Sequence, residues 1–242
     1  MLSRSAERLY WLARYLERTE NTARLISATT NLIYDLPFGV ELGWNNLLNI
    51  SGVEADFYQR FKNPTEQNTT RFLLTDLSNP GSLLMSLSSA RENLRTSREL
   101  MPDEAWEHVN QMYLYARANI DHVSNRRGRA HFLREILSGC QRFTGFTVGS
   151  MSHDDSYRFI CLGRNIERAD MTTRIMDFGT VLLAENRSHH MREYENILWI
   201  NVLKSLSAVL GCRNKSLCPS YFTPDFWLAI LLKKAWRFFR TV

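Results

Sequence analysis

The sequence predicts an all-α protein, an antiparallel helical bundle built from two related halves. Three observations support this fold class. Apolar residues recur at helical spacing through almost every segment, and no stretch alternates apolar and polar residues long enough to indicate a sheet strand. Glycine and proline are scarce, at 11 and 6 of 242 residues. A stretch near the start of the chain also returns about 150 positions later with most of its charged residues unchanged.

The repeat relates residues 8–26, RLYWLARYLERTENTARLI, to residues 158–176, RFICLGRNIERADMTTRIM. Without a gap, 7 of the 19 aligned positions are identical, and most of the identities are charged residues. Two generic amphipathic helices share apolar positions rather than charged ones. Each copy contains the motif Arg-x-x-Glu-Arg, at 14–18 and at 164–168. We therefore expect a pseudo-twofold arrangement in which the two motif helices are neighbours at the centre of the bundle.

The helices of the first half follow from capping and breaking residues. The sequence Leu-Pro-Phe-Gly at 36–39 should end the first helix, because proline cannot continue one. Asn79-Pro80 is a good start for a later helix, and Pro102 is a good start for the next. The expected helices cover residues 3–34, 42–61 with a break near Ser51-Gly52, 66–77, 81–100 and 102–121.

The second half begins with a polar sequence at 124–129, which we expect to be a loop because it contains charged residues and a glycine. Three further helices are expected at residues 130–149, 152–183 and 193–210. The middle one carries the second copy of the motif. Short connections between helices favour antiparallel neighbours, so the bundle should run up and down.

Composition excludes several classes of protein. The net charge of +5 is small, and lysine and arginine are mixed with acids, so we expect no nucleic-acid partner. The four cysteines contain no CxxC pair, which favours free thiols in a reducing cytosol. The first turns carry charges rather than the apolar core of a signal peptide. The longest apolar run, residues 226–232, is too short to span a membrane. The expected location is therefore the cytoplasm.

Each motif helix should have one polar face and one apolar face, because residues advance by about 100° along a helix. The polar face of the first copy contains Arg14, Glu17, Arg18, Asn21 and Arg24. The polar face of the second copy contains Arg164, Glu167, Arg168, Asp170 and Arg174. We call these ten residues the Arg/Glu seam. Glu20 with Arg24, and Asp170 with Arg174, also have the favourable acid-before-base order four residues apart.

The seam supports three interpretations. The charges could be structural, either as solvated ion pairs or as a partly buried network, since guanidinium groups bind carboxylates through two hydrogen bonds. The arginines could instead bind an anion, such as a phosphate, a carboxylate or a peptide C-terminus. Glu17 and Glu167 could also meet as paired carboxylates and act as acid and base. The sequence leaves these readings open, and with them the question of whether the protein is an enzyme.

A di-metal site is one function that the acidic residues of the two motif helices could serve. Glu17-x-x-Glu20 and Glu167-x-x-Asp170 place two acids on each of two helices. The Glu-x-x-His pattern of di-metal carboxylate proteins is missing from both, and arginines crowd the same face. We therefore expect no metal, and no motif indicates another cofactor.

Other polar clusters are weaker candidates. His153-Asp154-Asp155 precedes the second motif helix and suits a helix N-terminus, with His153 facing a site as the alternative. The segment 91–95 could be a third contributor to the seam. His189-His190, Cys212 and Cys218 lack metal-ligand spacing and are expected in a surface loop. Three aromatic residues are expected in the core and at its rim: Trp106, Tyr113 and Tyr115.

Three segments resemble the bacterial alpha-E domain family, which is all-helical and named for its Glu-Arg motif. They are LSRSAERLYWLARYLERTENTARLI at 2–26, NPGSLLMSLSSARENLRTSRELM at 79–101 and LGRNIERADMTTRIMD at 162–177. The resemblance covers about residues 1–208. It implies a role in a peptide-ligating, amide-forming system, with a circularly permuted ATP-grasp ligase and a transglutaminase-like protein as partners. The family motif residues carried over are Glu17, Arg18, Glu167 and Arg168.

The chain after residue 208 departs from the family pattern. Residues 209–242 match nothing in it, which a frameshift or truncation would explain. Residues 226–239 are apolar and basic, as in a stray helix, an exposed adhesive segment or a membrane-surface element. We therefore expect an alpha-E-like helical domain at 1–208 followed by an unmatched tail. The expected function is that of a ligase partner, with an acid–base enzyme as the alternative; the sequence fixes neither substrate nor oligomeric state.

Overall fold

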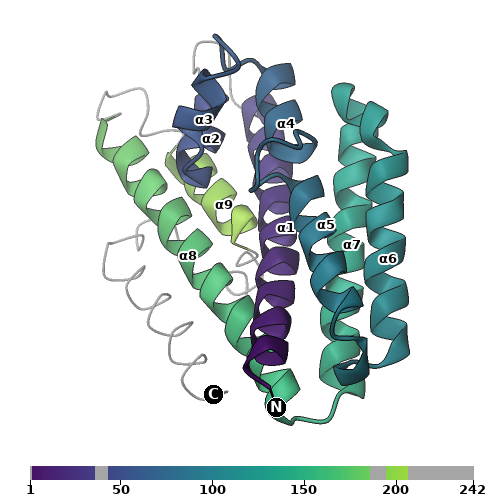
Figure 1. The fold of residues 1–242 in the computed structure, drawn as a ribbon. Helices are drawn as coiled ribbons and strands as arrows, with labels where there is room; N and C mark the ends of the chain where they lie inside the picture. Colours follow the sequence, from purple (N-terminus) through teal and green to yellow (C-terminus); the bar gives the residue numbers. More distant parts are fainter. Residues whose placement is uncertain (1, 36–42, 186–194, 207–242) are drawn as a thin grey trace.

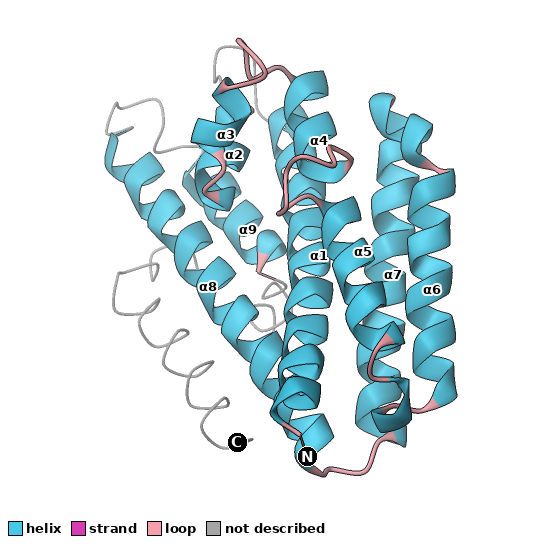
Figure 2. Ribbon diagram, in the orientation of Figure 1, coloured by secondary structure: helices cyan, strands magenta, loops and turns pink. Residues whose placement is uncertain are grey.

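A computed structural model describes residues 2–35, 43–185 and 195–206 (Figure 1). Within these ranges the regular elements are all helical, which confirms the all-α prediction (Figure 2). The long helices are α1 (Ser3–Asp35), α5 (Leu83–Arg95), α6 (Asp103–Ala118), α7 (Arg126–Ser150), α8 (Asp155–Glu185) and α9 (Glu195–Ser205). The short ones are α2 (Asn45–Ser51), α3 (Glu54–Tyr58), α4 (Glu66–Leu74) and the 3-10 turns η1 (Arg98–Leu100) and η2 (Ile120–Ser124).

Helix α1 is the central element, with α8 on one side and α5, α6 and α7 on the other (Figure 1). It packs against α5, α7, α8 and α9. Because neighbours surround it, apolar residues on several sides of α1 are buried rather than one stripe alone. The most deeply buried of them are Leu9, Leu12, Ala23 and Ile26.

Successive long helices run antiparallel, as predicted. The Arg8 guanidinium at the start of α1 donates to the carbonyl of Thr96, just past the end of α5, at 2.6 Å. Helices α6 and α7 also run in opposite directions (Figure 1). This up-and-down order follows from short connections between the helices.

The two motif helices are the exception, because α1 and α8 lie side by side and run parallel (Figure 1). They cross closely at Gly163, where an added Cβ would lie 2.2 Å from the Tyr10 carbonyl oxygen and 3.2 Å from the Ala13 Cβ. Ala13 and Gly163 occupy equivalent positions of the repeat. The antiparallel prediction concerns helices joined by short connections, and α1 and α8 are not joined in this way. The wider arrangement in two related halves stays a prediction, since much of the chain after α8 lies outside the described residues.

The starts of α5 and α7 differ from the sequence-based expectation. Helix α5 begins after Ser82, whose hydroxyl accepts from the Met85 amide at 3.3 Å. Asn79-Pro80 instead forms a turn before the helix, in which the buried Asn79 side chain accepts from the Gly81 amide at 2.9 Å and donates to the Phe72 carbonyl at 3.0 Å. The break expected near Ser51-Gly52 is present, and Gly52 ends α2 in the left-handed conformation with φ 68°.

The segment 124–129 is not the polar loop that its composition predicted. Helix α7 starts at Arg126, because Asn125 caps it by accepting from the Gly128 amide at 2.7 Å. Arg129 is therefore helical, and it is only 1% exposed. The aromatic residues Trp106, Tyr113 and Tyr115 pack half-buried against the core, as expected.

Several expectations fall outside the described residues. They concern His189-His190, Cys212, Cys218 and the apolar, basic segment 226–239. The boundary at residue 208 stays a prediction for the same reason. Among the helices of the described ranges, none is long and apolar enough to cross a membrane.

Candidate functional site between the motif helices

Glu167 of α8 lies between two arginines of α1. The Arg14 Nε donates to Oε2 at 2.7 Å, and the Arg18 Nε donates to Oε1 at 2.6 Å. A second Arg18 nitrogen donates to Oε2 at 3.1 Å, so the Arg18 contact is bidentate. The Glu167 side chain is only 3% exposed. A buried carboxylate of this kind requires such partners, because an unpaired buried charge is strongly destabilising.

Glu17 of α1 forms the reciprocal contact with Arg168 of α8. The Arg168 Nε and one terminal nitrogen donate to the two carboxylate oxygens at 2.7 and 2.9 Å. Glu17 is as deeply buried as Glu167, whereas the Arg168 side chain is 44% exposed. Each motif glutamate is therefore bound by an arginine from the other copy of the motif.

The local sequence explains why these groups meet. Ala13 and Gly163 bring the two helix backbones together, and each lies one helical turn before its motif glutamate. Because the helices run parallel, equivalent positions face each other at the same level. Leu12 and Leu16 bury the other side of α1 in the core, which fixes the rotation that points Glu17 towards α8.

The two copies of the motif differ in how their first arginine is held. Arg14 donates to the Tyr10 hydroxyl at 3.1 Å and lies 5.4 Å from the Trp11 ring centre. The equivalent neighbours in α8 are Ile160 and Cys161, which cannot give the same support. Arg164 forms a weak 3.8 Å contact with the Cys161 sulfur and interacts with the Tyr157 hydroxyl, and its Nε is buried without a hydrogen-bond partner among the described residues.

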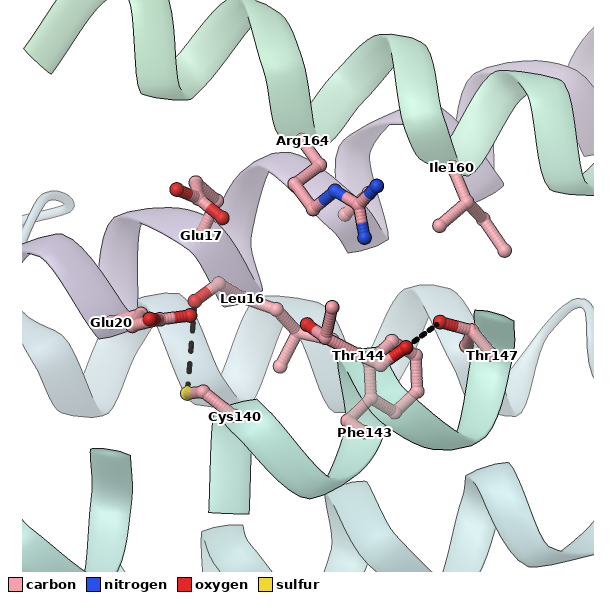
Figure 3. Close-up of a pocket in the computed structure, with 10 residues that line it drawn as sticks. Leu16, Glu17, Glu20, Cys140, Phe143, Thr144, Thr147, Ile160 and Arg164 are labelled. Carbon is pink, nitrogen blue, oxygen red and sulfur yellow. Dashed lines mark hydrogen bonds between the residues drawn. The ribbon is translucent and has the colours of Figure 1, made fainter. Parts of the chain in front are cut away.

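Arg164 and Glu17 instead border a small cavity between α1, α7 and α8 (Figure 3). Its volume is about 20 Å³, which is enough for one water molecule. Glu20, Thr144 and Thr147 add polar atoms to its wall, and Phe143 and Ile160 close its apolar side. In Figure 3 the Arg164 guanidinium lies in the middle of the view, between Glu17 and Ile160.

Glu17 has an altered acidity at this position. Burial raises the pKa of its carboxyl above the ordinary value of 4.5, and the charge of Glu20 adds to this effect. The hydrogen bonds from Arg168 act in the opposite direction but do not cancel the effect of burial. Glu17 therefore holds a proton more readily than an exposed glutamate does.

The outer residues of the seam pair within their own helices rather than across them. Arg24 binds Glu20, and Arg174 binds Asp170 at 3.1 Å. The amide nitrogen of Asn21 is buried and has no partner among the described residues. The structure thus joins five seam residues across the interface: Arg14, Glu17, Arg18, Glu167 and Arg168.

Segment 91–95 does not contribute to the seam as the sequence suggested. Arg91 donates to Asn110 of α6 at 2.7 Å and lies 5.2 Å from the ring centres of Trp106 and Tyr113. Arg91 therefore joins α5 to α6. His153 is exposed and stacks on Tyr157, with ring centres 4.2 Å apart, so it does not face the seam.

Sequence reasoning missed a second ion-pair cluster. The buried Arg129 of α7 and its neighbour Arg126 both bind Glu66 of α4. The Tyr34 hydroxyl of α1 also contacts this carboxylate, at 3.3 Å. The sequence feature that indicates this cluster is Asn125. As an N-cap residue it predicts a helix that starts at residue 126 rather than at 130, which places Arg129 on the helix. No group of three or more potential metal ligands occurs within the described part of the chain.

The fold and the paired motifs define an all-helical protein whose two central parallel helices exchange arginine–glutamate contacts. A comparison with protein families matches residues 1–215 to Alpha-E, described as a predicted alpha-helical domain with a conserved ER motif. The chain therefore belongs to the Alpha-E family. Its Glu17-Arg18 and Glu167-Arg168 are the two Glu-Arg pairs of the interface. No curated protein and no solved structure matches the chain.

Proposed function

We propose that this protein is a non-catalytic helical partner of an ATP-grasp peptide ligase, in a system that also contains a transglutaminase-like protein. The resemblance of the motif segments to the alpha-E family supports the identity of these partners. The observation that carries the non-catalytic role is the exchange of contacts between Glu17 and Glu167 and the arginines of the opposite helix. Carboxylates whose oxygens are occupied by arginine donors are held in a fixed orientation, which suits a rigid scaffold better than a proton-transfer centre.

The arginines of the interface also offer a contact for a partner. The Arg14, Arg18 and Arg168 side chains are 18%, 26% and 44% exposed, so each reaches the surface while it binds a buried glutamate. Guanidinium groups have more donors than one carboxylate uses. A carboxylate or peptide segment of the partner can therefore bind on the outer side of the seam.

Co-purification with the ligase tests this proposal. The tagged protein should retain a co-expressed ATP-grasp ligase of the kind that the family resemblance implies, and ligase product should fall when this chain is left out. Arg168→Gln should weaken the complex, whereas Arg158→Gln, an exposed arginine on the same helix, should not. If the purified proteins do not associate and the amount of product is the same without this chain, the proposal is wrong.

The alternative is an enzyme of the same pathway that uses Glu17, with Glu167, as acid and base. The raised pKa of Glu17 and its position on a water-sized cavity beside Arg164 favour this alternative. It predicts that Glu17→Gln abolishes product formation while the melting temperature stays near that of the wild type. The exposed Glu7→Gln is the control. Full activity of Glu17→Gln, or loss of activity only through unfolding, would rule out the catalytic role.

A further inference from the structure

A second cavity, of about 200 Å³, lies between α6 and α7 and is lined by no residue of the motif helices. Its base is formed by Met112 of α6 and Gly139 of α7. An added Cβ on Gly139 would lie 2.8 Å from the Met112 sulfur. The glycine therefore leaves room for the Met112 side chain to pack against α7.

The two ends of this cavity carry opposite charges. His108 and Arg142 line one end, since the His108 ring contacts Phe146, one turn beyond Arg142, with ring centres 5.3 Å apart. Glu135 lines the other end beside Tyr115, whose ring stacks on Phe132, one turn before Glu135. Glu135 and Arg142 lie two turns apart on α7, which places the two charges at opposite ends of the cavity.

The charged groups at both ends are available to a ligand. Among the described residues, neither Arg142 nor Glu135 forms a hydrogen bond or ion pair through its side chain. The seam arginines Arg14, Arg18 and Arg168, and the two arginines that bind Glu66, are by contrast bound to carboxylates. An unpaired cation and an unpaired anion on one concave surface are the features that orient a small polar ligand.

The spacing of the charges sets the length of the ligand. Glu135 and Arg142 are seven residues apart on α7, which corresponds to about 10.5 Å along the helix axis. An extended peptide spans roughly 3.3–3.6 Å per residue, so three residues cover about 10 Å. A single amino acid is too short to reach both charges at once.

We propose that the groove between α6 and α7 binds a short peptide of about three small residues with free termini. The peptide carboxylate lies against Arg142 and His108, and its ammonium group lies against Glu135. The modest volume of the cavity favours side chains as small as alanine. The proposal rests on α6 and α7 alone and is independent of the ligase partnership.

Calorimetric titration of the full chain with trialanine tests the assignment. Trialanine with free ends should bind saturably. The same peptide acetylated at its N-terminus or amidated at its C-terminus should bind at least about tenfold more weakly, because each cap removes one charge-assisted contact. Free alanine should also bind at least about tenfold more weakly.

Charge-neutralising variants locate the site. Arg142→Gln and Glu135→Gln should each weaken trialanine binding by about tenfold or more. Arg134→Gln on α7 and Glu107→Gln on α6 remove the same charges from exposed positions that do not line the cavity, and binding should be unchanged. Far-ultraviolet circular dichroism should give the same helix content for all four variants.

Three results would overturn the proposal. They are the absence of saturable trialanine binding at millimolar concentration, equal binding of the free and doubly capped peptides, and wild-type binding by both Arg142→Gln and Glu135→Gln. Since none of these measurements uses the ligase, a failed co-purification leaves this result unaffected, and a failed titration leaves the partnership unaffected.

Discussion

Glu17 and Glu167 hold equivalent positions in the repeat but have different surroundings. Glu167 forms ion pairs with two arginines, whereas Glu17 forms an ion pair with Arg168 alone among the described residues. Glu17 also lines a small cavity together with Glu20. The difference arises at Arg164, which has Ile160 and Cys161 where Arg14 has Tyr10 and Trp11. Glu17 is therefore the residue at which loss of one partner should have the largest effect.

Arg168→Met should destabilise the protein by about 3 kcal/mol at neutral pH, because it leaves the Glu17 carboxylate buried and unpaired. The pKa of Glu17 already lies above 4.5 and should rise further in this variant. Between 4.5 and that raised pKa, the folded state binds a proton that the unfolded state does not. Stability therefore increases as the pH falls through this window, and the deficit of the variant should shrink. Urea unfolding at several pH values measures this.

Two further variants check the cause. Glu17→Gln combined with Arg168→Met should recover most of the lost stability, since the buried charge is gone. Arg158→Met removes an exposed arginine of α8 and should change the free energy of unfolding by less than about 0.5 kcal/mol. A deficit in Arg168→Met that stays constant between pH 7 and pH 5 would contradict the assignment to Glu17.

Much of the candidate site was predictable at the level of single residues. Helical periodicity placed Glu17 and Glu167 on polar faces, and the repeat indicated that the two faces are related. It did not predict that Arg164 would differ from Arg14. That difference depends on which side chains surround the arginine in the folded protein, and Tyr10 and Trp11 affect Arg14 only through their contacts with it.

At the scale of elements, the close crossing of α1 and α8 is what makes the exchange of arginines possible. Gly163 lies against the Tyr10 carbonyl, so no side chain separates the two backbones there. A parallel pair of helices cannot be recognised from periodicity, because periodicity gives the buried face of a helix and not its direction. The expectation of antiparallel packing came from short connections, which apply only to helices adjacent in sequence.

Gly163→Val should destabilise the protein by at least about 2 kcal/mol, because its side chain would have to push α1 away from α8. Gly145→Ala is the matched control: it also replaces a helical glycine, but an added Cβ there meets nothing within 4 Å. Alanine should stabilise helix α7 by about 0.5–1 kcal/mol at that position. Thermal unfolding of both variants measures the difference, and a Gly163→Val protein as stable as the wild type would show that the crossing is loose.

The starts of α5 and α7 show where prediction of elements fails. Asn79 and Ser82 are both good caps, and the sequence does not show that the Asn79 side chain is bound to the Phe72 carbonyl. At α7, the charged residues 126–129 suggested a loop, although Arg129 is buried against Glu66. Both errors arise from a polar side chain whose partner lies on another helix, α4.

At the scale of the whole molecule, Glu66 joins three helices at one end of the bundle. It binds Arg126 and Arg129 of α7, and the Tyr34 hydroxyl near the end of α1 contacts it. Burial acts to raise the pKa of Glu66, but the hydrogen bonds from the two arginines outweigh it and lower the pKa below 4.5. The ion pairs of Glu66 with Arg126 and Arg129 therefore stabilise the folded protein at neutral pH, where the Glu66 carboxylate is ionised.

Glu66→Gln should reduce the stability of the protein by roughly 2 kcal/mol at pH 7, because Arg129 loses its charged partner. The lowered pKa fixes the sign of the pH dependence. The contribution of Glu66 is complete above pH 4.5 and is lost as the pH falls through the folded-state pKa. The curves of wild type and variant should therefore converge below pH 4.5 in chemical unfolding experiments.

The exposed Glu92, which pairs with Arg95, provides the control. Its pKa is also lowered, first by the hydrogen bonds from Arg95, but the pair lies on the surface. Glu92→Gln should therefore leave the free energy of unfolding nearly unchanged at every pH. If Glu66→Gln keeps its deficit in acid, the buried arginine rather than the carboxylate charge explains the effect.

The parallel contact between α1 and α8 has a consequence for how the chain is made. The arginine partner of Glu17 and the helix α8 that carries it lie about 150 positions downstream, so this interface has a very long sequence separation. At about 5–20 residues per second, a ribosome needs roughly 8–30 s to supply them. During that interval helix α1 exists without the helix that covers it, and Glu17 has no arginine to bind. The nascent chain therefore depends on α5 and α7, which emerge earlier, to protect α1 until α8 arrives.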